Sequence, residues 1–115
     1  MRYPFERLFL VCTGARCNAD ERGQECGANI RDLLKDHNKE LKRKPSVRVT
    51  SVSCLDLCDH GPNMLVWPDG TVFSHLTREL ALAVYAGEMG DGEPRNDLRL
   101  TEAEFRSGNS AAARR

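Results

Sequence analysis

The sequence lacks the features that would place it in several large classes of protein. Its 17 Lys+Arg balance 17 Asp+Glu, so it has no basic excess of the kind that marks a dedicated nucleic-acid binder. No apolar run approaches the ~20 residues that a membrane-spanning helix needs, and the charged start does not resemble a signal peptide. We therefore expect a cytoplasmic protein with no membrane segment and no nucleic-acid partner, and 115 residues predict one domain.

Two kinds of catalytic motif are also missing. The sequence has no Cys-x2-Cys motif, which argues against thiol exchange of the thioredoxin type. No motif frames a serine as a nucleophile, so a hydrolytic triad is not supported either. We expect no substrate turnover by the chain itself.

What the sequence does contain is five cysteines. An odd number cannot pair completely in disulfides, and a reducing compartment favours metal or catalytic chemistry for clustered thiols. Thiolates select zinc or iron–sulfur clusters. Only Cys54-x3-Cys58 is tightly spaced, and the other pair is either Cys12-x4-Cys17 or Cys12-x13-Cys26. This spacing favours a two-iron cluster only modestly over zinc.

The hydrophobic pattern predicts a β-α-β-β-α order. The apolar run 8–11 predicts a strand buried on both faces, and 46–53 predicts a second strand. Between them lies a polar loop, 13–25, and then a helical stripe that ends at Pro45. The stripe comprises Ile30, Leu33, Leu34 and Leu41, with His37 in one of its positions.

A hairpin and a second helix complete the expected fold. Residues 63–67 and 71–74 predict two strands joined by the turn Trp67-Pro68-Asp69-Gly70. Thr77 is a suitable cap for a helix that ends at Gly87 and Gly90. The fold class is therefore α/β: a small mixed four-stranded sheet flanked by two helices. Residues 1–100 form the domain and 101–115 a polar tail.

This topology predicts where the thiols meet. Strands joined through a helix run parallel with a right-handed crossover, so the first two strands end at the same edge of the sheet. Cys12 ends the first strand, and Cys54 and Cys58 follow the second. Cys26, beside the expected helix start, faces that edge too. Ligands tend to bind there in open α/β sheets.

Several segments resemble one family, the thioredoxin-like [2Fe-2S] ferredoxins. They are Phe9-Leu10-Val11-Cys12-Thr13, Cys54-Leu55-Asp56-Leu57-Cys58, Gly61-Pro62-Asn63-Met64-Leu65-Val66-Trp67-Pro68-Asp69-Gly70 and Gly92-Glu93-Pro94. The same fold occurs in the small subunit of bacterial NADH dehydrogenases and hydrogenases. The resemblance implies a thioredoxin-like fold, one [2Fe-2S] cluster held by four cysteines, one-electron transfer between redox partner proteins, and a homodimer.

The resemblance implies Cys12, Cys26, Cys54 and Cys58 as the ligands, with Cys17 as the alternative to Cys26. The stand-alone ferredoxins have a long loop before their second ligand, which fits Cys26, whereas the dehydrogenase subunits use Cys-x4-Cys, which fits Cys17. If Cys17 is the ligand, Asn18 and Glu21 could form a capping box and the helix would start there. That helix would be long and would contain two glycines, so we favour a start near Cys26.

Two other functions remain open from the sequence. One is an interaction module in which the same four cysteines hold zinc, and the other is the ferredoxin-like subunit of a larger oxidoreductase. Around the ligands, Gly14 and Gly61 are placed to allow close backbone approach. Asp56 and Asp59 add negative charge, which is expected to lower the reduction potential. His60 could ligate a metal, but a structural role is the more common one for such a histidine.

Overall fold

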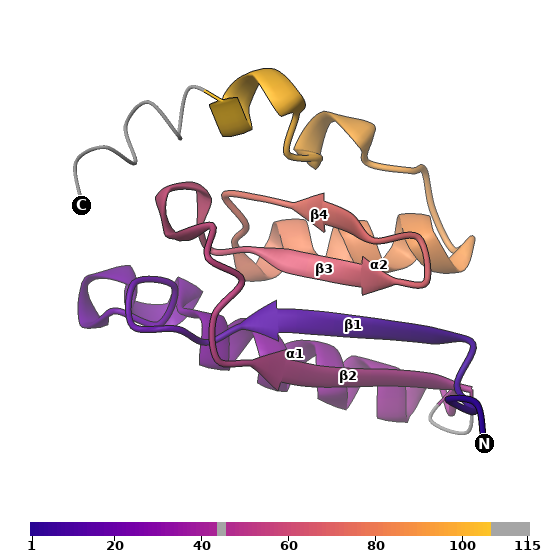
Figure 1. Ribbon diagram of the computed structural model, residues 1–115. Coiled ribbons are helices and arrows are strands. Elements are labelled where there is room, and N and C mark those ends of the chain that lie inside the picture. The colour runs from indigo at the N-terminus through magenta and orange to yellow at the C-terminus, as the bar shows by residue number, and fades with distance from the viewer. Residues whose placement is uncertain (44–45, 107–115) are drawn as a thin grey trace.

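The computed structural model describes residues 1–43 and 46–106 (Figure 1). Its main elements are β1 (Arg7–Cys12), α1 (Gly27–Glu40), β2 (Val47–Val52), β3 (Met64–Trp67), β4 (Thr71–Phe73) and α2 (Arg78–Met89). Three short 3-10 helices lie between or after them: η1 (Asp20–Glu25), η2 (Cys58–His60) and η3 (Asn96–Leu98). None of the helices in this part of the chain has the length and apolar character to cross a membrane.

The four strands form one sheet in the order β2-β1-β3-β4. β1 and β2 are parallel, whereas β3 is antiparallel to both β1 and β4. Both helices lie on the same face of the sheet (Figure 1). The predicted β-α-β-β-α order, the parallel first pair and the hairpin are therefore confirmed.

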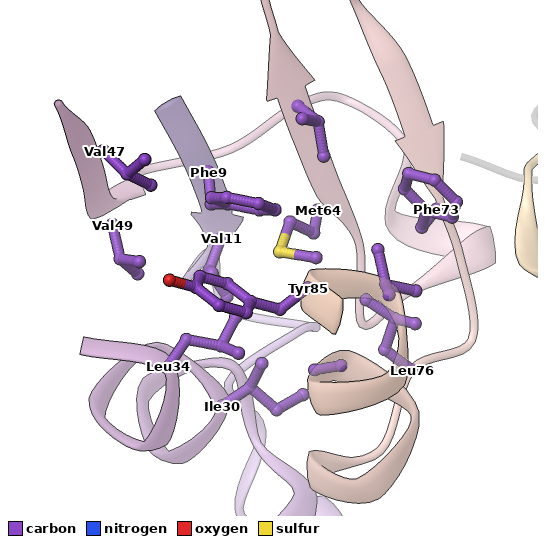
Figure 2. Packing of buried hydrophobic residues seen from close by; sticks show 13 residues of the cluster. Phe9, Val11, Ile30, Leu34, Val47, Val49, Met64, Phe73, Leu76 and Tyr85 are labelled. Atoms are coloured by element: carbon purple, nitrogen blue, oxygen red, sulfur yellow. The ribbon is translucent and has the colours of Figure 1, made fainter. Parts of the chain in front are cut away.

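The core lies between this sheet and the two helices. Phe9 and Tyr85 meet at its centre with ring centroids 5.0 Å apart, and Met64 lies beside them (Figure 2). Tyr85 also carries a polar atom into the core, and its hydroxyl donates to Oδ1 of buried Asn38 at 2.6 Å. The Asn38 amide donates in turn to the Val47 carbonyl at 2.9 Å, so each of these buried polar groups has a partner.

Two sequence expectations about burial are wrong. β1 is buried on one face only: Phe9 and Val11 are in the core, but Leu8 and Leu10 on the other face are only half-buried. The open face arises because both helices cover the same side. In α1 the stripe stops early, since the helix ends at Glu40 and Leu41 is 41% exposed. Pro45, the expected helix stop, lies outside the described residues, as does the tail beyond residue 106.

The predicted start of α2 at Thr77 and its end at Gly90 are confirmed, whereas Gly87 does not mark the end of the helix. The Thr77 side chain accepts a hydrogen bond from the Leu80 amide at 3.2 Å, which satisfies one of the unpaired donors at the start of the helix. Gly90 ends the helix with φ 79°, a left-handed conformation that favours glycine. Gly87 lies inside the helix, where the backbone of Glu93 packs against it.

Candidate metal centre

Thiols from distant stretches of the chain lie at the carboxyl edge of β1 and β2. Cys12 is the last residue of β1 and pairs in register with Val52, the last residue of β2. Cys54 follows β2 by two residues. A Cβ placed on Gly14 would lie 3.6 Å from the Cys12 sulfur and 3.5 Å from Cβ of Cys54, so both cysteines border the same glycine. The parallel strands thus bring these two side chains together.

The Cys54 and Cys58 sulfurs form a close pair, 3.8 Å apart. Two thiolates on one tetrahedral ion, with metal–sulfur bonds of about 2.3 Å, lie roughly 3.8 Å apart. The loop also supplies a donor, because the Asp56 amide points at the Cys54 sulfur at 3.2 Å. Such an N–H stabilises negative charge on sulfur. The pair therefore has the spacing of two ligands on one metal ion.

Cys17 forms a second contact, with Cys12. Both side chains are 1% exposed, and their thiols interact. Burial raises the pKa of the Cys17 thiol to about 11, and the contact with Cys12 acts in the same direction. A Cβ on Gly61 would lie only 2.6 Å from the Cys17 sulfur, so the backbone there packs directly against it. The expected close approach of Gly61 is confirmed.

Cys26 is placed differently from the other cysteines. It is the residue that precedes α1, it is half-buried, and it makes neither of the two sulfur contacts. Its neighbour Gly27 packs so tightly on β1 that an added Cβ would lie 2.1 Å from the Cys12 carbonyl oxygen. The Cys26 backbone therefore lies at the same edge as Cys12, at the positive end of the α1 dipole.

The loop between β1 and α1 anchors the start of the helix. The Gly27 amide donates to the Cys17 carbonyl at 2.8 Å, and the Ala28 amide donates to Asn18 Oδ1 at 2.8 Å. The capping box that an earlier helix start requires does not form, because Asn18 caps α1 from a distance of ten residues. The short helix η1 lies in the stretch that the sequence predicts as loop.

An ion pair joins the two loops that carry the thiols. Arg16 Nη1 lies 2.9 Å from Asp59 Oδ1, although the two residues are 43 positions apart. Burial and the neighbouring Cys54 raise the pKa of the Cys58 thiol, whereas the positive charge of Arg16 lowers it. Asp59 is thus compensated by a nearby cation. This nearby positive charge weakens the effect that Asp59 has on the neighbouring thiols.

The histidines do not join the thiols in a compact site. His60 is 8% exposed, and its ring lies 6.0 Å from that of His75, centroid to centroid. Throughout residues 1–43 and 46–106, no three Cys, His, Asp or Glu side chains form a group that could surround one metal ion. The thiols stand instead as the pairs Cys12/Cys17 and Cys54/Cys58, with Cys26 beside the first pair.

This donor set fits a two-iron cluster. The thiols come from several loops at one edge, and one pair has the separation of two ligands on one iron. All five cysteines are free of disulfides. Cys54 is exposed, so the site opens to the surface.

Comparison with known proteins finds one similar curated protein and several similar structures. No family model matches the chain. A protein of Clostridium pasteurianum named "Ferredoxin, 2Fe-2S" is 24% identical over 100 residues, which cover 84% of this chain and 97% of that protein. The crystal structure of the wild-type thioredoxin-like [2Fe-2S] ferredoxin from Aquifex aeolicus superposes with a TM-score of 0.69 at 18% identity, covering 87% of this chain and all of that one.

The chain has the thioredoxin-like ferredoxin fold. A second structure of the Aquifex aeolicus protein gives a TM-score of 0.70 over 86% of this chain and 93% of that one. The superpositions thus cover nearly the whole length of these structural relatives. The fold agrees with the predicted fold class.

Proposed function

We propose that this chain is a [2Fe-2S] ferredoxin, which carries single electrons between redox partner proteins and turns over no substrate of its own. The observation that carries the proposal is the meeting of thiols from separate segments at one edge, with Cys54 and Cys58 at the spacing of two ligands on one metal ion. The 2Fe-2S ferredoxin of Clostridium pasteurianum, similar over most of both chains, supports it. The ferredoxin unit spans residues 1–100.

We propose Cys12, Cys26, Cys54 and Cys58 as the ligands. Cys26 lies at the positive end of α1, where a helix stabilises a thiolate, and it is accessible to a cluster that opens to the surface. Cys17 is instead packed beneath Gly61 and serves to anchor its loop. Because Cys17 contacts Cys12, it is the alternative fourth ligand.

The chain supplies the surroundings that electron transfer requires. When bound, the cluster provides a centre that accepts and releases one electron. The Asp56 amide donates to the Cys54 sulfur, and the α1 dipole and Arg16 offset the negative charge of the site. β1 and β2 pair Cys12 in register with Val52, two residues before Cys54. Exposed Cys54 marks the face where a cytoplasmic redox partner docks.

Chemical analysis of protein purified without oxygen tests the proposal. We expect a coloured protein with two iron ions and two acid-labile sulfides per chain. Colourless protein that contains zinc and no sulfide would contradict it and would support the zinc-bound interaction module. As a control, the Cys54→Ala variant should lose the colour, since it removes one of the paired thiols.

We further propose that the protein forms a homodimer through the open face of the sheet. On this face half-buried Leu8 and Leu65 lie beside Trp67. Trp67 is 37% exposed and packs edge-on against Tyr3 with centroids 5.4 Å apart. Exposed aromatic residues are frequent at the centres of interfaces. Sedimentation equilibrium should give twice the chain mass of 12.9 kDa, and Trp67→Lys should reduce it to the chain mass. A wild-type monomer would contradict this.

A further inference from the structure

Asn63 is a buried polar residue that touches all three segments that carry the paired thiols. It lies just before β3 and is 1% exposed. Its amide nitrogen donates to the Leu57 carbonyl at 2.7 Å, directly before Cys58. The main-chain carbonyl of Asn63 accepts a hydrogen bond from the Cys12 amide at 3.0 Å. The side-chain nitrogen of Asn63 lies 3.9 Å from the Cys17 sulfur.

One side-chain atom of Asn63 is energetically unfavourable in its buried position. Its Oδ1 is buried and has no hydrogen-bond partner among the described residues. An unsatisfied buried acceptor is unfavourable, and an apolar residue of the same shape would avoid it. The other contacts of Asn63 explain the polar side chain, because only a donor at this position can hold the Leu57 carbonyl while reaching toward the Cys17 sulfur.

We propose that Asn63 is the positioning residue of the metal centre, which fixes the loop that carries Cys58 relative to the end of β1 and to the buried Cys17. The inference rests on the proposed function, since it assigns Asn63 to the same centre. Its side chain restrains one thiol-bearing loop through Leu57, and its backbone continues the pairing of β3 with β1 at Cys12. Partners that orient metal ligands in this way affect metal affinity without binding the metal.

Asn38 offers a matched control. It is also buried, at 4% exposed, and its amide also donates to a main-chain carbonyl, that of Val47 at 2.9 Å. It accepts a hydrogen bond from Tyr85, and among the described residues it makes no hydrogen bond with a cysteine. Asn38→Leu and Asn63→Leu therefore each remove a buried side-chain amide that donates to a main-chain carbonyl. Only Asn63→Leu makes this change at the metal centre.

The first measurement uses the cluster-loaded full chain. With an iron chelator present, we expect Asn63→Leu to lose its visible colour about 10- to 100-fold faster than the wild type. It should also shift the reduction potential, because the thiols move relative to their N–H donors. Asn38→Leu should lower the thermal unfolding temperature but retain the wild-type potential and rate of colour loss. Equal behaviour of the two variants would overturn the proposal.

The second measurement uses metal-free protein, so it does not depend on the cluster. Iodoacetamide should modify Cys17 faster in Asn63→Leu than in Asn38→Leu, because the packing over that thiol loosens only in the former. Equal rates would overturn the positioning role of Asn63. Wild-type protein without iron and sulfide would contradict the proposed function instead, and the alkylation rates would still decide the role of Asn63.

Discussion

Replacing Gly27 by alanine is expected to destabilise the protein strongly, although alanine normally favours a helix over glycine by about 1 kcal/mol. The added Cβ would lie 2.1 Å from the Cys12 carbonyl oxygen, far inside van der Waals contact. That oxygen belongs to the backbone of a central strand, so neither α1 nor β1 can yield cheaply. Overpacking of this kind costs about 1–3 kcal/mol and sometimes more, so the clash outweighs the helix preference.

Urea unfolding measures this effect as a shift in midpoint at a constant slope. Gly92→Ala is the control, because its Cβ would meet only the Ala86 side chain at 3.4 Å. We expect Gly92→Ala to change the free energy of unfolding by less than about 0.5 kcal/mol. Gly27→Ala protein as stable as Gly92→Ala protein would show that α1 does not pack on β1 as described.

Cys26→Ala is expected to abolish stable cluster binding, whereas Cys17→Ala retains it. Removal of a ligand leaves an iron with an incomplete set of thiolates. Cys17 does not replace Cys26, because its sulfur is packed beneath Gly61 and burial raises the pKa of its thiol to about 11. Alanine is preferable to serine for both variants, because a serine oxygen can itself bind iron. The measurement is iron and sulfide per chain together with the visible spectrum.

The reverse result would assign the fourth ligand to Cys17. Loss of the cluster in Cys17→Ala alone would mean that the contact with Cys12, and not the position at the start of α1, selects the ligand. Cys58→Ala serves as the reference for complete loss in either case. Circular dichroism of each variant checks that the fold remains, since Cys17 is buried and its removal leaves a small cavity.

The local sequence pattern predicted the helices, strands and turns well, because each of them depends on residues that are close in the chain. The cap at Thr77 and the positive φ of Gly70 follow from the residue types at those positions. The polar residues that act within the folded interior were not predicted. Asn38 accepts from Tyr85, 47 positions away, and no short-range pattern distinguishes it from an exposed helical asparagine.

The same reason limits what could be said about the metal centre. Asn63 follows the pair Gly61-Pro62, which gives no sign that the Asn63 amide reaches back to Leu57 and toward Cys17. The ion pair Arg16–Asp59 is another contact between distant segments. The sequence does not reveal this contact, so the charge of Asp59 is expected from the sequence to be uncompensated. The sequence shows only that an asparagine stands directly before an apolar strand, and its burial is known from the structure alone.

The sequence by itself determined the order of the elements, the parallel pairing of β1 with β2, and hence that Cys12 and Cys54 end at one edge. These follow from hydrophobic periodicity and from the handedness of a crossover, both of which are properties of the connected chain. Only the tertiary structure decided that both helices cover one face, that Cys17 is buried against Cys12, and that Asn63 joins the thiol-bearing segments. Those outcomes depend on side-chain packing between segments far apart in the chain, which local patterns do not encode.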